Sequence, residues 1–173
     1  MCSPETVVLE TPRLILRTIT LDDVDAVALT WKLYEGPISR EDAQYQVARM
    51  IGNHRQNAPG KITHLCLAII HKEAREWIGW CGLDNLDQAR PNPVLFYLLK
   101  TSYWGQGLAT EAARALLDFA FDELSLARID SSAAHDNVAS KRVMEKLGMQ
   151  YLGLDEEGGH SFTLTREEYL YRR

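Results

Sequence analysis

A buried strand that leads directly into a glycine turn and then into an amphipathic helix is the feature that most limits how this chain folds. The segment PVLFYLLK (93–100) is almost unbroken in its apolar character, as in a central strand covered on both faces. Gly105 and Gly107 follow, and helical spacing of apolar residues begins at Ala109. At such a junction the first backbone N–H groups of the helix lack helical partners, and the helix dipole adds partial positive charge. The junction therefore predicts an anion site suited to a pyrophosphate.

The remaining segments place this junction within a sheet covered by helices. Alternating apolar and polar residues predict strands, and helical periodicity predicts the helices between them. Ser39 is a predicted N-cap, because its hydroxyl can accept a hydrogen bond from an amide of the first turn. The mixture predicts an α/β fold built on one sheet of mixed strand direction. The predicted strands are 13–20, 62–70, 75–86, 93–100, 127–134 and two within 149–165, and the predicted helices follow Thr20, Ser39, Gly107 and Asn137.

Length and composition favour a single domain spanning residues 1–173. The formal charge of −5 argues against a nucleic-acid partner, which normally requires a surface excess of Lys and Arg. No segment approaches the ~20 apolar residues of a membrane span, and no basic flank precedes an apolar leader, so we expect a cytoplasmic location and no membrane partner. Cys2, Cys66 and Cys81 lack the spacing of metal ligands, so we expect no metal.

Two common phosphate-binding motifs do not fit the glycine turn. A Walker loop requires a Lys followed by Ser or Thr after its last glycine, and none follows Gly107. The dinucleotide fingerprint G-x-G-x-x-G begins with Gly105 and Gly107 but meets Thr110 at its third glycine. The turn therefore indicates a phosphate loop of another kind, although a nucleotide-phosphate domain of a different fold stays an alternative.

The segments YWGQGLATEA and HDNVASKRVMEKLGM, at this spacing and in this order, resemble the GNAT superfamily of acetyl-CoA-dependent N-acetyltransferases. The opening LETPRLILRTITLDD is similar to the branch that contains the ribosomal-protein N-terminal acetyltransferases, and the resemblance covers about residues 9–169. It implies the GNAT fold, a mixed and mostly antiparallel sheet of about six or seven strands with about four helices. It also implies that two strands splay apart where the cofactor binds.

The resemblance further implies which residues bind acetyl-CoA. The family's loop Q/R-x-x-G-x-G/A corresponds to residues 104–109, with Trp104 in place of the usual Gln or Arg. Asn137 is implied to bind the pantetheine arm, and Ser140 to protonate the leaving thiolate, since this helix lacks the tyrosine that many relatives use. The implied cofactor-binding residues are Leu98, Leu99 and Lys100 through their backbone, Gly105, Gln106, Gly107, Leu108, Ala109 and Thr110 in the loop, and Asn137 and Ser140.

The sequence offers no evident general base for the acceptor amine. Leu95 stands where several relatives carry a Glu, which leaves Asp84, His135 and Asp136 as candidates that could act through water. Deprotonating a lysine-type amine at pH 7 costs about 4–5 kcal/mol, whereas a peptide α-amino group costs about 1 kcal/mol. A site without a strong base is better matched to the α-amine. An acyl-cysteine route through Cys81 is disfavoured because no activating base lies beside it in the sequence.

We therefore predict an N-acetyltransferase that moves an acetyl group from acetyl-CoA to a primary amine by direct attack. The predicted acceptor is a protein or peptide N-terminal α-amino group. The alternatives are a small-molecule amine and a non-catalytic module that binds acyl-CoA. The sequence leaves open whether the protein is a monomer or a homodimer. The acceptor pocket is expected to involve the first two helices and the last hairpin, with Trp31, Tyr34, Glu35 and His160 as candidate lining residues.

Overall fold

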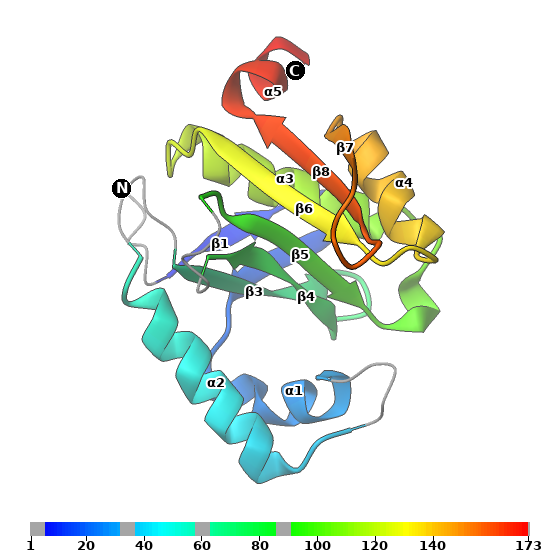
Figure 1. Ribbon diagram of the computed structural model, residues 1–173. Helices are drawn as coiled ribbons and strands as arrows, with labels where there is room; N and C mark the ends of the chain where they lie inside the picture. The colour runs from blue at the N-terminus through cyan, green and yellow to red at the C-terminus, as the bar shows by residue number, and fades with distance from the viewer. Residues whose placement is uncertain (1–5, 32–36, 58–62, 86–90, 173) are drawn as a thin grey trace.

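The computed structural model of the protein describes residues 6–31, 37–57, 63–85 and 91–172. Its centre is an eight-stranded sheet with the strand order β1-β2-β3-β4-β5-β6-β8-β7 (Figure 1). Neighbouring strands are antiparallel except β5 and β6, which are parallel and joined by a helical crossover. The strands are β1 (Val8–Glu10), β2 (Leu14–Thr18), β3 (His64–His71), β4 (Glu76–Asp84), β5 (Val94–Leu99), β6 (Arg128–Ala133), β7 (Gln150–Leu154) and β8 (His160–Thr165).

Helices cover both faces of this sheet. Helices α1 and α2 lie together on one face, and α3 and α4 lie on the other (Figure 1). The side chain of Ser39 caps α2 by accepting a hydrogen bond from the amide of Asp42 at 3.0 Å, as the sequence predicts. The helices are α1 (Val24–Thr30), α2 (Arg40–His54), α3 (Leu108–Asp122), α4 (Val138–Lys146) and α5 (Arg166–Arg172), with 3-10 turns η1 (Leu21–Asp23) and η2 (Thr101–Tyr103).

The predicted α/β class and the mostly antiparallel sheet are confirmed, but the described residues form eight strands rather than about six or seven and five α-helices rather than about four. The extra strand is β1, an edge strand of three residues that is too short to produce a clear alternation. The extra helix is α5, whose seven residues bury only Tyr169 and so lack an apolar face in the sequence.

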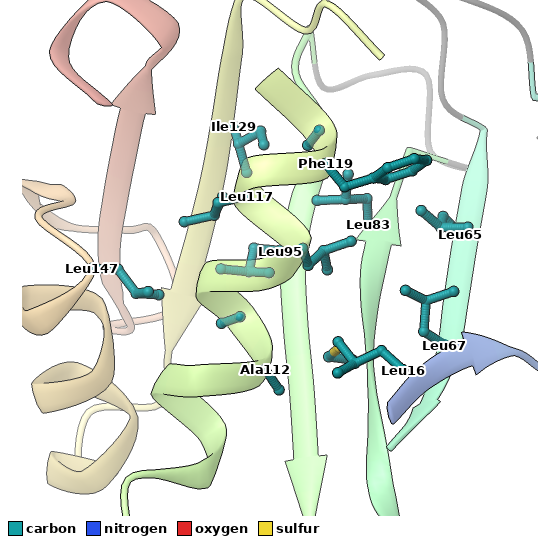
Figure 2. Packing of buried hydrophobic residues seen from close by; sticks show 14 of the residues in the cluster. Leu16, Leu65, Leu67, Leu83, Leu95, Ala112, Leu117, Phe119, Ile129 and Leu147 are labelled. Carbon is teal, nitrogen blue, oxygen red and sulfur yellow. The ribbon is translucent and has the colours of Figure 1, made fainter. Parts of the chain in front are cut away.

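Side chains that alternate along the strands divide the interior into two cores. On β3, Leu65, Leu67 and Ile69 point to the α3 face, whereas Cys66 and Ala68 point to α1 and α2. Burial of each large apolar side chain contributes roughly 1.5–3 kcal/mol, which makes the α3 face the main source of stability. Figure 2 shows α3 lying across this face, with Leu16, Leu65, Leu67, Leu83, Leu95, Ala112, Leu117, Phe119 and Ile129 packed around it and Leu147 beside α4.

A bulge in β4 places two tryptophans on the same side of the sheet. Ile69 pairs with Gly79 and Ile70 pairs with Trp77, so Ile78 is an extra residue in β4. In a regular strand, residues three apart face opposite sides. The extra residue lets both Trp77 and Trp80 join the core beneath α1 and α2.

The parallel strands β5 and β6 separate soon after they meet. Their register joins Val94 to Asp130 and Leu95 to Ser131, and no later pair is found in the described parts of the two strands. The hydroxyl of Ser131 also donates to the carbonyl of Leu95 at 2.9 Å, at the last position where the two strands pair. Beyond this point the described part of β5 is not paired with β6, and on this edge the carbonyl of Leu99 accepts a hydrogen bond from the indole N–H of Trp104 at 2.8 Å. This is the splayed pair of strands that the resemblance implies.

Candidate functional site

The glycine turn opens the N-terminus of α3 toward solvent. Gly105 and Gly107 have φ angles of +73° and +77°, in the left-handed region that favours glycine. Gly107 is the N-cap residue, and no side chain caps the helix. The first-turn amides of α3 therefore have no capping side chain, and the positive end of the helix dipole is available to an anion.

Two side chains from near the N-terminus, those of Thr11 and Arg13, hold this turn in place through hydrogen bonds. Arg13 donates through Nη1 to the carbonyl of Gln106 at 3.0 Å and through Nε to the carboxylate of Glu111 at 2.7 Å. The hydroxyl of Thr11 donates to the same carboxylate at 2.6 Å. Partial burial raises the pKa of Glu111, but the hydrogen bonds from Thr11 and Arg13 outweigh it and lower the pKa overall. With its carbonyl held by Arg13, the peptide of Gln106 is fixed in one orientation.

A pocket of about 390 Å³ lies beside this turn, within the usual range for small-molecule sites. It is formed by three elements that the sequence separates: β5, the turn into α3, and α4. Its lining residues are Tyr97, Leu98 and Leu99 from β5, Tyr103, Trp104, Gly105, Gly107, Leu108, Ala109 and Thr110 from the turn and α3, and Asn137, Ala139, Ser140, Arg142, Val143 and Lys146 from the start and body of α4.

The structure thus brings most of the predicted cofactor residues together, with two exceptions. The side chain of Lys100 pairs with Glu76 at 2.5 Å, and its amide donates to the carbonyl of Ile78 at 2.8 Å. Lys100 therefore does not line the pocket, and its backbone N–H is already used by the bulge of β4. Gln106 does not line the pocket with its side chain either, because Nε2 donates to the carbonyl of Ser102 at 3.2 Å.

Asn137 and Ser140 sit at the start of α4, on the far wall of the pocket. The side chain of Asn137 accepts a hydrogen bond from the amide of Ser140 at 3.0 Å, so it caps the helix. The hydroxyl of Ser140 lies 2.7 Å from the hydroxyl of Tyr97 on β5. Burial raises the pKa of Tyr97, and the hydrogen bond with Ser140 offsets only part of this rise, so the phenol is protonated at neutral pH.

Sequence reasoning missed four polar residues of the pocket: Tyr97, Tyr103, Arg142 and Lys146. The two cations could have been found from helical spacing, because 139, 142, 143 and 146 repeat at the interval of one helix face. Tyr97 gives no such signal, since it lies within an apolar run and its partner Ser140 is far away in the sequence.

The candidate groups for the acceptor side are not gathered in one place. Asp84 and Trp31 line a second pocket on the opposite face of the sheet. His135 stacks on His160 with ring centroids 5.4 Å apart, outside the residues that line either pocket. Asp136 is exposed in the turn before α4. Tyr34 and Glu35 lie outside the described residues.

The described cysteines are poorly suited to nucleophilic chemistry. Cys66 and Cys81 are both completely buried, and burial raises the pKa of each thiol well above its usual value. Their thiolate forms are therefore scarce at neutral pH. Within the described ranges, no group of three or more His, Cys, Asp or Glu side chains could hold a metal ion. None of the described helices is long and apolar enough to cross a membrane.

A helix N-terminus without a side-chain cap, beside a strand that separates from its neighbour, is an arrangement of α/β proteins that suits a long phosphorylated ligand. The sequence profile of the acetyltransferase (GNAT) domain matches residues 13–150. The chain is 30% identical over 177 residues to the uncharacterized N-acetyltransferase p20 of Bacillus licheniformis, covering 93% of this chain and 97% of that one. It is also 30% identical over 168 residues to the FsC-acetyl coenzyme A-N(2)-transacetylase of Aspergillus fumigatus, covering 86% and 68%.

Solved structures show the same fold. The ribosomal L7/L12 alpha-N-protein acetyltransferase RimL superposes with a TM-score of 0.77 at 17% identity, covering 92% of this chain and 94% of that one. A second RimL structure, a complex with coenzyme A, superposes with a TM-score of 0.75 at 16% identity, covering 92% and 98%. The chain belongs to the GNAT acetyltransferase family, which uses acetyl-CoA, so the predicted enzyme class is confirmed.

Proposed function

We propose that this protein transfers an acetyl group from acetyl-CoA to a primary α-amino group, with the donor bound in the pocket between β5 and α4. The observation that carries the proposal is the convergence of the uncapped α3 N-terminus, the free edge of β5 and the Tyr97–Ser140 pair on one pocket. Each supports one part of the donor: the pyrophosphate, the pantetheine arm and the thioester. The CoA complex of RimL, a protein of the same fold, supports this assignment by analogy.

The pyrophosphate is assigned to the mouth of α3. Backbone N–H groups around Gly107 attract it by hydrogen bonds and by the helix dipole. Gly107 carries no Cβ that would keep the phosphate away from the backbone. Arg142 and Lys146 on α4 line the same pocket and add positive charge, which lowers the free energy of a bound diphosphate.

The pantetheine arm is assigned to the free edge of β5, where alternate residues present their backbone groups. The amide of Lys100 points to β4, because it donates to the carbonyl of Ile78. Residues two apart in a strand point the same way, so Leu98 also points to β4 and its backbone is used in the sheet. Tyr97 and Leu99 therefore present their N–H groups to the β6 side. We assign the cofactor contacts to these two amides, in place of those of Leu98 and Lys100.

The thioester is assigned to the Tyr97 end of the strand. Moving from Leu99 to Tyr97 leads away from the phosphate turn and toward Ser140. The N–H of Tyr97 then lies where it can polarise the thioester carbonyl and stabilise the oxyanion. The amine nitrogen attacks the carbonyl carbon, the carbon–sulfur bond breaks, and Ser140 donates its proton to the departing thiolate and regains one from solvent. Solvent takes the proton that the amine loses.

The acceptor class follows from the free energy of deprotonation. At neutral pH an α-amine costs only about 1 kcal/mol to deprotonate, compared with about 4–5 kcal/mol for a lysine-type amine. Leu95 is buried at the position where several relatives carry a glutamate, so it supplies no base there. RimL acts on an alpha-N position, which supports a protein N-terminus as the acceptor. The relative from Aspergillus fumigatus is named for an N(2) position, which favours a small-molecule α-amine as the second candidate.

The proposal is tested by measuring release of CoA thiol from acetyl-CoA with a panel of amines. The panel contains short peptides with free N-termini, the same peptides with blocked N-termini and one lysine, amino-acid amides, and polyamines. We expect release with free α-amines and little release with lysine side chains. Binding of acetyl-CoA without release by any amine would support the non-catalytic module instead.

A further inference from the structure

A second pocket, of about 230 Å³, lies on the opposite face of the sheet, between α1, α2 and strands β3 to β5. Three aromatic side chains form its walls: Trp31, Trp80 and Phe96. The rings of Trp31 and Trp80 meet edge to face with centroids 5.4 Å apart. Its polar lining includes His64, Asp84 and Arg49. The volume is below the roughly 300–1,000 Å³ of drug-sized sites, so it suits one side chain or a small molecule.

His64 is the unusual residue of this pocket. Only 8% of its surface is exposed, and neither ring nitrogen has a hydrogen-bond partner within the described residues. Its Nδ1 lies 3.6 Å from Oδ1 of Asp84, which is longer than a hydrogen bond. The ring stacks against His54 at 6.0 Å and Phe96 at 5.9 Å, so its plane is held on both sides. A buried polar group left without a partner destabilises the folded protein, and a bound ligand that pairs with it removes that cost.

His64 offers both a donor and an acceptor to such a ligand. Burial lowers its pKa, the nearby Asp84 raises it, and Arg49 lowers it, with a net decrease. His54, which lies beside it on α2, also has a lowered pKa and is neutral. A neutral imidazole carries one N–H and one lone pair. The group that best satisfies it is a hydroxyl or amide at the far end of a planar side chain that fits between the aromatic walls.

The two pockets share a wall at β5. Leu98 lines the donor pocket and, like Phe96, also packs against the core that contains Trp80. Tyr97 lines the donor pocket, whereas its neighbour Phe96 lines the second pocket, as the alternation of a strand requires. A molecule in the second pocket therefore lies across a single strand from the proposed thioester.

We propose that the second pocket holds the side chain of the acceptor, and that His64 selects α-amines whose side chain is planar and ends in a hydrogen-bonding group, as a tyrosyl α-amine does. The inference rests on the proposed function and adds to it a preference for one class of acceptor. The source of the tyrosyl group, a free small molecule or the first residue of a peptide, is separated by the experiment.

The experiment compares L-tyrosinamide with L-phenylalaninamide, and a peptide that begins with Tyr with the same peptide beginning with Phe. Each pair differs only in the distal hydroxyl. We expect kcat/KM to favour the tyrosyl member by about tenfold or more, because the phenylalanyl member leaves His64 unpaired. The pair with the higher kcat/KM identifies the source of the acceptor. A ratio near one in both pairs overturns the inference.

Two variants test whether His64 causes the preference for tyrosyl acceptors. His64→Phe keeps an aromatic ring but removes the nitrogens, so the preference is expected to disappear with the KM for acetyl-CoA unchanged. His64→Gln keeps a donor and an acceptor and is expected to retain part of the preference. Retention of the full preference in His64→Phe contradicts the role of His64. If that variant does not fold, the wild-type comparison of the two pairs decides the question.

Failure of this inference differs from failure of the proposed function. Acetylation of other α-amines without any preference for the tyrosyl compounds rejects the role of His64 and leaves the proposed function standing. If no amine is acetylated, binding to the CoA-loaded protein is followed by the ring-nitrogen NMR signals of ¹⁵N-labelled histidine, assigned with His64→Gln. A shift of the His64 signals with tyrosinamide but not phenylalaninamide supports the pocket, and no shift overturns it.

Discussion

The hydroxyl oxygens of Tyr97 and Ser140 lie 2.7 Å apart and join strand β5 to helix α4 across the donor pocket. The Tyr97 hydroxyl also lies 3.1 Å from the backbone carbonyl of Ser140, so the phenol can donate either to that carbonyl, with Ser140 donating to Tyr97, or to the Oγ. If Tyr97 donates to the Oγ of Ser140, the serine keeps its own proton free for the departing sulfur. Because the pKa of Tyr97 is raised, the phenol retains the proton that this arrangement requires. Tyr97 is then a positioning residue for the proton donor.

We expect Ser140→Ala to lower kcat by roughly 100-fold or more and Tyr97→Phe by roughly tenfold, with the KM for acetyl-CoA nearly unchanged in both. The double variant is expected to be no slower than Ser140→Ala alone, because the phenol acts through the serine. Steady-state kinetics of the four proteins, with acetyl-CoA and the best amine of the panel, test this. Independent, multiplicative losses would contradict the pairing.

Tyr169→Phe provides the matched control for Tyr97→Phe. The Tyr169 hydroxyl donates to Asp118 at 2.9 Å, in the core between α3 and α5 and outside the donor pocket. Its loss is expected to lower the free energy of unfolding by about 1 kcal/mol and leave kcat unchanged. An equal fall of kcat in both variants would indicate a general effect on folding instead.

Two glycine substitutions separate the phosphate turn from ordinary helix stability. Gly107→Ala places a Cβ at φ +77°, which costs about 1–2 kcal/mol, and the methyl group holds the pyrophosphate off the backbone. We expect the Kd for CoA to rise about tenfold, equivalent to one lost charge-assisted hydrogen bond. Gly52→Ala lies within helix α2 with open space around its Cβ, so it is expected to stabilise the protein by about 0.5–1 kcal/mol without changing the Kd. Calorimetry and thermal unfolding measure both quantities.

The hydrogen bonds from Arg13 to Gln106 and Glu111 are expected to raise the affinity for the cofactor, although Arg13 is not among the residues that line the donor pocket. Arg13→Met frees the carbonyl of Gln106 and leaves the Glu111 carboxylate beside the anion site without its cation. A rise of about three- to tenfold in the Kd for CoA corresponds to roughly 1 kcal/mol. Arg40→Met is the control, because the Arg40–Asp25 pair is largely exposed, and such pairs contribute about 0–1 kcal/mol. Equal affinities for the two variants would show that the hydrogen bonds of Arg13 do not shape the turn.

The buried histidines make stability fall in mild acid. Burial lowers the pKa of His54 to about 4, and its Nε2 accepts a hydrogen bond from the amide of Cys66 at 2.8 Å. The unfolded chain binds a proton near pH 6.5, whereas the folded protein does not until about pH 4. The contribution of His54 is therefore complete above pH 6.5 and falls by about 3 kcal/mol as the pH drops to 4.

Urea unfolding between pH 7.5 and 4.5 measures this dependence, with His54→Gln as the comparison. The glutamine can still accept the Cys66 amide but does not titrate, so its stability is expected to change less with pH. A variant with the same pH slope as the wild type would assign the effect to other groups, such as His64, whose pKa is lowered as well.

Much of the fold and the phosphate turn could be predicted because the signals are local. The helix over 40–54 has its cap at Ser39, and the two glycines that need positive φ lie next to the helix they open. The bulge at Ile78 could not be predicted, because nothing in its own sequence fixes the register of β4 against β3. That register decides that Trp77 and Trp80 share one face, and so it decides the second core.

The β5 amides that are proposed to contact the cofactor could not be predicted from the sequence alone either. The sequence predicts that the end of β5 meets the cofactor, but which amides face the gap depends on the hydrogen bond between Lys100 and Ile78. The Tyr97–Ser140 pair and the isolated His64 also arise from contacts between distant segments. Residue types alone predict neither the Tyr97–Ser140 contact nor the unpaired ring nitrogens of His64.

The most direct test of the central claim is a crystal structure of the protein grown with coenzyme A. The account predicts the diphosphate against the amides around Gly107, the pantetheine arm along Tyr97 and Leu99, and the sulfur near Ser140. Coenzyme A bound at any other place on the sheet, or a titration that detects no binding at millimolar ligand, would contradict it.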